Sequence, residues 1–346
     1  MVIKTEDYTY ELPRELIAQE PCQRRQDSRL LVLDRNGSIQ HRRFEELGDY
    51  LNSGDLLLLN DTKVLPVRLK GTDESGKVRD IVIVRELESG GCRILSKGRY
   101  TGRLRMGDDF HAEVSSGSTA VFYDNTGVLS GSALIDKLWQ TGQMPLPPYI
   151  ERPSGGIDKQ RYQTVYARAA GSIAAPTAGL HFTEDILQGI RDKGVTIKPV
   201  TLHVGIGTFR PITTDDLMAH KMDEELFEID AHLDQQIRQV KGRGNRVIVV
   251  GTTTTRAVEA YMAGWYRLTQ EERLNGVIRG ATDIFITPGF AFKAADALLT
   301  NLHMPRSTTL VLACAFAGRG HILNAYREAV DQGYRFLSYG DAMLII

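Results

Sequence analysis

The sequence predicts an α/β domain that carries an inserted antiparallel β domain. Strand-like runs alternate with helical patterns in the first 60 residues and again after residue 146, and this alternation is typical of a largely parallel sheet. Between them, short β-prone runs and turn clusters follow one another closely, as in a small barrel or sandwich. We therefore expect residues 1–60 and 146–346 to form an α/β domain with a mixed, largely parallel sheet, and residues 61–145 to form an inserted β-barrel.

The first 60 residues contain two helical patterns and two strand patterns. Pro13 suits the first turn of a short helix, and SRLLVLD at 28–34 has the apolar continuity of a strand. Phe44, Leu47 and Leu51 keep helical spacing. They lead into GDLLLLND at 54–61, which predicts a short buried strand.

The inserted segment is a series of short β-prone runs: VLPVRLKG, RDIVIVREL, CRILSK, FHAEVS and TAVFYD. Turn clusters such as DESG, ESGG, SSGS and DNTG separate them. Short strands at this spacing favour antiparallel pairing. Pro66 within the first run predicts an edge or a bend, because proline cannot donate to a β-ladder.

After a proline-rich connection at 145–148, helices and strands alternate again. Thr183 can cap a helix, because its side-chain oxygen can accept from the free N–H groups of the first turn. The elements expected after this helix are a strand at 195–205, a helix around 233–240, a strand at 246–251, a strand at 283–289 and a last helix at 321–332.

Composition places the 346-residue chain in the ordinary globular class, with 42% hydrophobic and 25% charged residues. The formal net charge is −1, so a nucleic-acid partner would need a local basic patch. Cys22, Cys92 and Cys314 show no zinc spacing and predict reduced thiols. The first residues lack an apolar signal region, and the uncharged stretch at 307–318 is about half a membrane span. We expect a soluble, cytoplasmic protein.

Four loops are candidates for ligand binding because each follows a predicted strand and is almost free of charge. In open α/β sheets, ligands bind at the carboxyl ends of strands. Small residues let a backbone approach a ligand, and threonines at a helix start suit an anion. Each loop also has an ordinary structural explanation, such as a tight turn or a helix cap. The loops lie at 171–182, 201–211, 247–260 and 282–292, the last followed by a further segment at 297–308.

Several familiar sites are excluded by missing motifs. The GxG at 205–207 is followed by Phe209, Arg210 and Pro211 instead of a third glycine and a helix, so a dinucleotide site of the Rossmann type is not expected. No GxxxxGK[ST], GxSxG or HExxH occurs, which argues against a P-loop, a serine hydrolase and a zinc protease. The three histidines in the loops favour a converging site without metal.

A basic run on the inserted segment is the best candidate for RNA contact. Tyr100 lies among these cations and could stack on a base while they bind phosphates. A solvated charged face is the alternative explanation. The predicted RNA-binding residues are Lys97, Arg99, Arg103 and Arg105.

Taken together, the segments resemble one family, the S-adenosylmethionine:tRNA ribosyltransferase-isomerases of queuosine biosynthesis. The resemblance spans the chain through the following blocks: LPxxLIAQxP, NDTKVLPVRLKG, PLPPYI, RYQTVYA, GSIAAPTAGLHF, TLHVGIGTFRP, GTTTTR, TDIFITPGF, TNLHMPRSTT, AFAG and YRFLSYGDAM.

The resemblance implies the fold above and a specific reaction. The ribosyl group of S-adenosylmethionine is moved onto 7-aminomethyl-7-deazaguanine at the wobble position of tRNA and rearranged, giving epoxyqueuosine, adenine and methionine. S-adenosylmethionine is consumed as a co-substrate. The resemblance implies no metal, no membrane and no obligate protein partner.

Such a reaction needs a base, because the sulfonium acidifies the adjacent C5′ hydrogens, and a donor for the departing adenine. The candidates for proton transfer are His181, His203, Glu225, Asp283 and His303. Asp223 stands where the resemblance leads us to expect a histidine, and it is a minor candidate.

The expected donor pocket places the threonine loop near the methionine carboxylate, with Asp61 and Thr62 at the domain junction. The predicted residues that bind S-adenosylmethionine or the wobble base are Asp61, Thr62, Pro176, Thr177, Gly179, Phe182, Gly205, Gly207, Thr208, Thr252, Thr253, Arg256, Pro288, Gly289 and Asn301.

Two other functions remain open at this point. An S-adenosylmethionine-dependent RNA methyltransferase would carry a GxGxG-type motif after its first strand and would leave a homocysteine product. A non-catalytic RNA-binding protein would need the basic barrel but not the uncharged loops. Release of adenine only when precursor-bearing tRNA is present separates the three functions.

Overall fold

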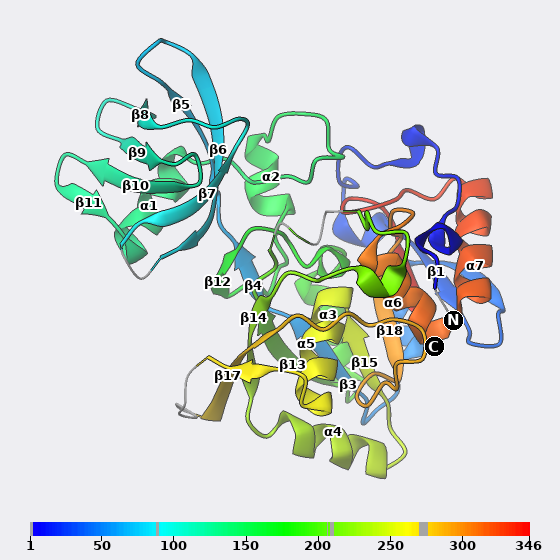
Figure 1. The fold of residues 1–346 in the computed structure, drawn as a ribbon. Helices are drawn as coiled ribbons and strands as arrows, with labels where there is room; N and C mark the ends of the chain where they lie inside the picture. Colours follow the sequence, from blue (N-terminus) through cyan, green and yellow to red (C-terminus); the bar gives the residue numbers. More distant parts are fainter. Residues whose placement is uncertain (1–2, 88–89, 206, 208–210, 270–275) are drawn as a thin grey trace.

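The computed structural model describes residues 3–87, 90–205, 207, 211–269 and 276–346. A large layered α/β body occupies one end of the molecule and a small β-barrel the other (Figure 1). Two short parallel strands pair where the two bodies meet: β4 (Thr62–Val64) and β12 (Ala169–Ser172).

The large body is built on a ten-stranded mixed sheet. Its centre, β13–β3–β15–β18, and the β19–β1 pair are parallel, whereas the other neighbours are antiparallel. The strands, in spatial order, are β16 (Arg267–Leu268), β17 (Val277–Thr282), β14 (Glu225–Asp230), β13 (Thr196–Leu202), β3 (Leu56–Asn60), β15 (Val247–Val250), β18 (Ala297–Asn301), β19 (Ala342–Ile345), β1 (Arg29–Leu33) and β2 (Ile39–Arg43).

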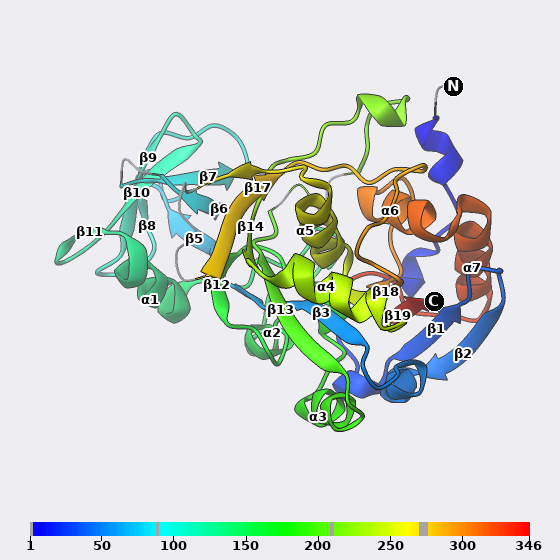
Figure 2. The ribbon, with the colours of Figure 1, turned by 90° about the horizontal axis from the view of Figure 1, so that it is seen from below.

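The central strands β3, β15 and β18 are buried throughout because both faces of the sheet are covered. Leu56 and Leu58 pack into the core under α4 to α7, while Leu57 and Leu59 pack into the core under α3, and Figure 2 shows α3 on the opposite side from α5. The helices are α3 (Glu184–Asp192), α4 (Leu233–Gly242), α5 (Thr252–Ala263), α6 (Thr308–Ala317) and α7 (Arg319–Asp331). Short 3-10 helices are η1 (Thr5–Tyr8), η2 (Arg14–Leu16), η3 (Arg25–Asp27), η4 (Phe44–Tyr50), η5 (Thr177–Gly179) and η7 (Leu217–Ala219).

The second body is a six-stranded antiparallel barrel that closes where β10 pairs with both β7 and β9. Alternate residues of its strands point inward. Its strands are β5 (Arg68–Thr72), β6 (Val78–Glu86), β7 (Cys92–Ser96), β8 (Gly102–Arg105), β9 (His111–Ser115) and β10 (Thr119–Asp124), with β11 (Gly127–Leu129) extending β10. Helix α1 (Gly131–Thr141) packs Leu134 and Leu138 into the barrel core.

The predicted fold class is confirmed: a mixed sheet with parallel strands and an antiparallel barrel. The domain limits at 60/61 and 145/146 stay a prediction. Helix α7 confirms the last helix, whereas the strand predicted at 283–289 is wrong. Strand β17 ends at Thr282, whose hydroxyl accepts from the N–H of Ile284, and Arg256 donates to the Ile284 carbonyl. The backbone groups of Ile284 therefore bind side chains and not a neighbouring strand.

The connection after the barrel contains α2 (Gly156–Arg161), which the sequence analysis did not predict. In the described part of the chain, no helix has the length and apolar character needed to cross a bilayer.

Candidate active site

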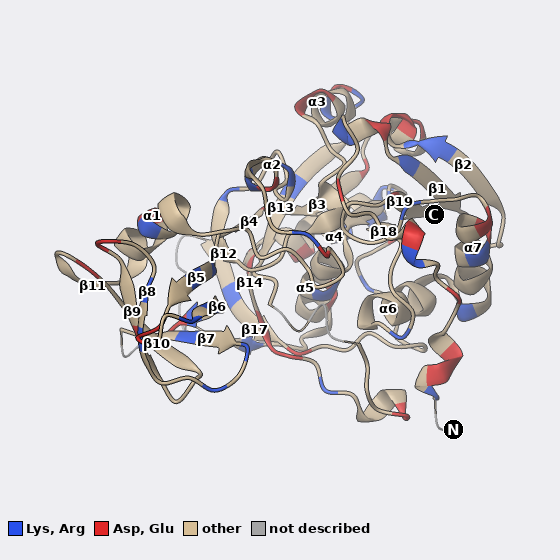
Figure 3. Cartoon of the chain, turned by 90° about the horizontal axis from the view of Figure 1, so that it is seen from above, with Lys and Arg blue, Asp and Glu red and all other residues tan. Residues whose placement is uncertain are grey.

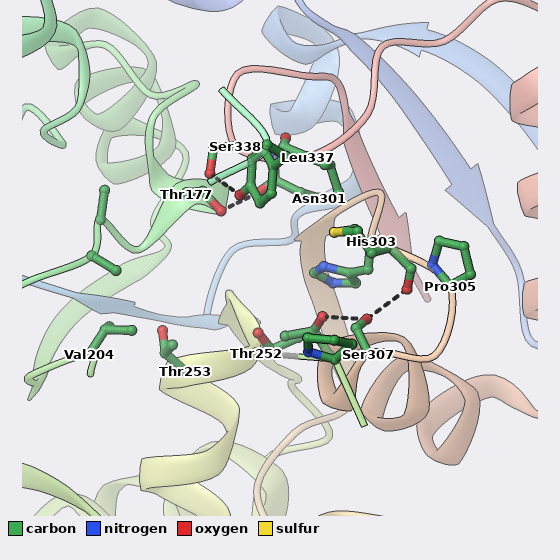
Figure 4. Close-up of a pocket in the computed structure, with 16 residues that line it drawn as sticks. Thr177, Val204, Thr252, Thr253, Asn301, His303, Pro305, Ser307, Leu337 and Ser338 are labelled. Carbon is green, nitrogen blue, oxygen red and sulfur yellow. Dashed lines mark hydrogen bonds between the residues drawn. The ribbon is translucent and has the colours of Figure 1, made fainter. Parts of the chain in front are cut away.

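A pocket lies at the carboxyl ends of β15 and β18, where α5 and α6 begin (Figure 4). It encloses about 730 Å³ of atom-free space, including its mouth, which opens to solvent. Its lining residues are Tyr149, Ala174, Ala175, Thr177, Val204, Pro211, Thr252, Thr253, Asn301, His303, Met304, Pro305, Ser307, Thr309, Leu337 and Ser338.

The lining is polar but uncharged. None of these described lining residues is Asp, Glu, Lys or Arg, and the ionisable groups among them are His303 and Tyr149. The Tyr149 and Ser338 hydroxyls are hydrogen-bonded at 2.7 Å. Burial raises the pKa of Tyr149 well above its usual range, so this phenol stays protonated.

The start of α5 presents two threonines to the pocket. Gly251 precedes the helix with φ +89°, a conformation that favours glycine. Thr255 turns its hydroxyl back to the Gly251 carbonyl at 3.0 Å, whereas Thr252 and Thr253 line the cavity (Figure 4). No side chain caps the helix, so capping does not explain these threonines. The Thr253 hydroxyl oxygen is buried and has no hydrogen-bond partner among the described residues.

The start of α6 faces the same pocket. The Ser307 hydroxyl accepts from the Leu310 N–H at 3.2 Å and donates to the Met304 carbonyl at 2.7 Å. Two helix amino termini therefore point at one uncharged cavity. Their partial positive charges favour an anionic group in the ligand.

His303 projects into the pocket on a loop fixed at its backbone (Figure 4). Tyr10 donates to the His303 carbonyl, and the His303 N–H donates to the Tyr326 hydroxyl at 3.0 Å. The His303 Nε2 lies 2.8 Å from the Thr300 hydroxyl. Burial lowers the pKa of His303 to about 3, so the imidazole is neutral near pH 7.

His181 stands behind the pocket and positions one of its walls. Its Nδ1 lies 2.7 Å from the Ser28 hydroxyl, and its Nε2 lies 3.3 Å from the Asn301 amide nitrogen. The Asn301 amide oxygen accepts from Thr177 at 2.9 Å. Because the Asn301 amide nitrogen can only donate, Nε2 is the acceptor and the proton lies on Nδ1. Burial, followed by the charge of Arg25, lowers the pKa of His181 to about 3.

Asp61, Thr62 and His203 form a separate group beside the pocket. The Thr62 hydroxyl lies 2.9 Å from His203 Nδ1. Asp61 accepts from Thr201 at 2.6 Å and pairs with Arg168 at 2.9 Å. Burial lowers the pKa of His203. His203 does not line the pocket, although the next residue does.

Glu225 and Arg256 form a buried ion pair, in which a guanidinium N–H donates to the carboxylate. Gly205 donates its N–H to Glu225 at 3.2 Å, and Arg256 donates to the Ile284 carbonyl at 3.1 Å. The pair therefore links β14 and α5 to the loops that contain Gly205 and Ile284. These contacts hold the Glu225 carboxylate in one position.

The structure brings several predicted residues together and leaves others elsewhere. Those that line the pocket are Thr177, Thr252, Thr253, Asn301 and His303. Pro176 directly precedes η5, and Gly179 is its last residue. Phe182 is wholly buried in the core, with its ring centroid 5.1 Å from that of Phe44.

The remaining predicted residues lie outside the pocket. Asp283 is exposed and accepts from Trp265 at 3.3 Å, and Pro288 and Gly289 occupy an exposed turn. Gly207 lies against Asp223, whose carboxylate a Cβ at position 207 would approach to 2.3 Å. Thr208 lies outside the described residues. The exposed cations Lys97, Arg99, Arg103 and Arg105 are on the barrel.

Sequence reasoning missed Tyr149, Ser307 and Ser338 as lining residues. Each belongs to a block that was noticed, PLPPYI, TNLHMPRSTT or YRFLSYGDAM, but no local pattern marks which side chain faces a ligand. In the described ranges, no group of three His, Cys, Asp or Glu side chains is arranged as metal ligands.

Comparisons with known proteins all indicate the same family. A family model described as queuosine biosynthesis protein matches residues 5–345. A relative from Thermodesulfovibrio yellowstonii, named S-adenosylmethionine:tRNA ribosyltransferase-isomerase, is 48% identical over 99% of this chain and 100% of its own length. A relative of the same name from Staphylococcus saprophyticus is 43% identical over 99% of each chain.

A crystal structure of an S-adenosylmethionine tRNA ribosyltransferase from Thermotoga maritima is also similar, with 34% identity and a TM-score of 0.55. The match covers 98% of this chain and 100% of that one. The family match and the relatives both extend over both bodies and over every loop of the pocket. The chain therefore belongs to the queuosine biosynthesis protein family.

Proposed function

We propose that this chain transfers and isomerises the ribosyl group of S-adenosylmethionine onto 7-aminomethyl-7-deazaguanine at the wobble position of tRNA. The products are epoxyqueuosine, adenine and methionine. The observation that carries the proposal is the uncharged pocket at the strand ends, built from loops that match relatives of this name over their full length. S-adenosylmethionine is a co-substrate here, and the tRNA with its modified base is the partner.

The pocket suits a donor that must lose a proton from carbon. The sulfonium acidifies C5′, and a neutral imidazole can accept that proton. When His303 donates its Nε2–H to Thr300, Nδ1 keeps a free lone pair. His303 is therefore our first candidate for the base. His181, His203 and Glu225 hold other parts of the site in place, which leaves them as weaker candidates.

Departure of adenine requires a hydrogen-bond donor for the leaving nitrogen. Tyr149 stays protonated and shares a hydrogen bond with Ser338 at the pocket wall. These hydroxyls are the candidates for that donor.

The test is product analysis with purified protein and S-adenosylmethionine. We expect adenine and methionine only when tRNA carrying the aminomethyl precursor is added, because the amine is the acceptor of the ribosyl group. The control is the same tRNA with unmodified guanine, which should give no adenine. S-adenosylhomocysteine as the product would instead indicate methyl transfer.

A further inference from the structure

A second, smaller cavity lies beside the candidate pocket, and Ser338 lines both. It is partly open and includes Cys22, Arg25, Ser28, Arg161 and His181 in its lining. We call it the arginine cavity. Because one residue separates the two cavities, a group bound here would lie close to a ligand in the pocket.

Two guanidinium groups line the arginine cavity without a carboxylate partner in the described part of the chain. Arg25 donates to the carbonyls of Leu180 and Gln160, both at 2.8 Å. Arg161 donates through Nη1 to the Gln23 carbonyl at 3.0 Å, while its Nε is buried and has no acceptor within the described ranges. Carbonyl contacts hold the side chains but do not neutralise their charge.

A third guanidinium adds positive charge next to this cavity. Arg335 donates to the Cys22 sulfur at 2.9 Å. Burial is the main cause of the lowered pKa of His181, and the charges of Arg25, Arg161 and Arg335 lower it further. Burial, and then the charge of Arg161, lower the pKa of Arg25 to about 10. The three cations are therefore close together, and none of them forms an ion pair with a carboxylate of the described residues.

The carboxylate on α2 is already committed to other partners. Asp158 pairs with Arg152 at 2.8 Å and accepts from the Tyr339 hydroxyl at 2.7 Å. It cannot also neutralise Arg161, which ends the same helix. Elsewhere, cations and anions are interspersed over both bodies (Figure 3), so an RNA substrate needs local sites of this kind.

We propose that the arginine cavity binds a backbone phosphate of the substrate tRNA, next to the nucleotide whose base enters the pocket. The inference rests on the proposed function. Guanidinium groups bind phosphate through paired N–H donors, and both Arg25 and Arg161 line this cavity. A nucleotide with its base in the pocket carries its phosphates within several ångströms, where Ser338 joins the two cavities.

The first test compares Arg161→Gln, Arg161→Lys and Arg24→Gln in binding to a precursor-bearing anticodon stem-loop. Arg24 is an exposed neighbour that pairs with Asp27 at 2.7 Å and lies outside the cavity lining. We expect Arg161→Gln to weaken RNA binding about tenfold or more and to reduce the salt slope by about one. Arg161→Lys should recover part of the affinity, and Arg24→Gln should match the wild type.

Turnover and stability measurements separate binding from a structural effect. For Arg161→Gln we expect a higher KM for RNA, nearly unchanged kcat at saturating RNA and an unchanged melting temperature. Wild-type affinity and salt slope in both Arg161→Gln and Arg25→Gln would overturn the proposal. An equal loss in Arg24→Gln would also overturn it, because the effect would then be general electrostatics.

Inorganic phosphate serves as the probe for a free-anion site. At constant ionic strength it should compete with RNA for the wild type and compete less for Arg161→Gln. If phosphate stabilises the wild type against heat but leaves RNA affinity unchanged, the cavity takes a free anion and the RNA assignment is wrong. If the wild type releases no adenine with precursor-bearing tRNA, the proposed function fails, whatever these variants do.

Discussion

At the scale of single residues, Thr253 tests how the donor is oriented. Its hydroxyl is buried at the start of α5 and has no partner in the part of the chain that the structure describes. A carboxylate bound there would also meet the free N–H groups of the helix. We expect Thr253→Val to raise the KM for S-adenosylmethionine about tenfold, through loss of a hydrogen bond to a charged group. Steady-state kinetics with saturating RNA measure this.

The matched control is Thr255→Val, because the Thr255 hydroxyl is used inside the helix. This variant should keep the wild-type KM. Decarboxylated S-adenosylmethionine provides a second control: the wild type should bind it more weakly, and Thr253→Val should show no further loss. If the wild type does not distinguish the two donors, the carboxylate does not lie at this helix.

His181 gives a prediction for stability against pH. Burial lowers its pKa to about 3 in the folded protein, compared with about 6.5 in an unfolded chain. The unfolded state therefore binds the proton first, and the stabilisation present above about pH 6.5 is lost as the pH falls toward 3. Between these values the free energy of unfolding should fall by up to about 1.4 kcal/mol per pH unit from this residue.

Denaturant titrations at pH 6.5 and pH 4.5 measure the effect. His181→Gln keeps polar groups for Ser28 and Asn301 but does not titrate, so its stability should fall less with acid than that of the wild type. Equal acid sensitivity in the two proteins would show that His181 is not held neutral by the fold.

At the scale of elements, Gly251 sets the direction of α5. Its φ is +89°, and an added Cβ would have no contact closer than 3.7 Å, so the cost of substitution is backbone strain and not a clash. We expect Gly251→Ala to lower the free energy of unfolding by about 1–2 kcal/mol. It should also raise the KM for S-adenosylmethionine, because Thr252 and Thr253 follow directly.

Gly244→Ala is the comparison for this effect. Gly244 also has a positive φ, +79°, with no neighbour within 4 Å, but it follows α4 and does not line the pocket. It should lose similar stability without a change in KM. A rise in KM in both variants would mean that reduced stability, and not the geometry of α5, causes the change.

The sequence predicted those elements whose pattern is local. The leucine run at 56–59 and the apolar run at 247–250 are buried strands, as their continuity indicates. The run at 283–289 has the same apolar character but is not a strand, because Thr282 and Arg256 bind the backbone of Ile284. Side-chain contacts between distant segments leave no local signal.

The same distinction applies to the site. Asn301 ends the buried strand β18 and His303 follows two residues later, so their place could be predicted. Tyr149 and Ser338 reach the pocket from the connection after the barrel and from the loop before β19. Only the assembled fold brings these two side chains together, at a hydrogen-bond distance of 2.7 Å.

At the scale of the whole molecule, the barrel lies beside the large body, and we expect RNA to contact both. A groove between them includes Lys70 and Lys97 together with the segment that precedes Tyr149. Both lysines are exposed. The RNA-binding role of Lys97, Arg99, Arg103 and Arg105 stays a prediction.

We expect the double variant of Lys70→Gln and Lys97→Gln to weaken stem-loop binding several-fold. It should also lower the salt slope by one to two, because each phosphate that a lysine no longer neutralises removes about one from the slope. Fluorescence anisotropy across a salt series measures both quantities. Arg42→Gln on β2, at the other end of the large sheet from the barrel (Figure 2), is the control and should bind RNA normally. Unchanged affinity in the double variant would place the RNA on another face.

The central claim is that the pocket holds S-adenosylmethionine and removes a proton from C5′ of its ribose. The most direct measurement follows donor labelled with deuterium at C5′ during turnover with precursor-bearing tRNA, in the wild type and in His303→Gln. We predict that the wild-type product loses one deuteron and that His303→Gln is slower by about a hundredfold or more. Adenine release with both deuterons kept in the product, or wild-type deuterium loss and rate in His303→Gln, would contradict the account.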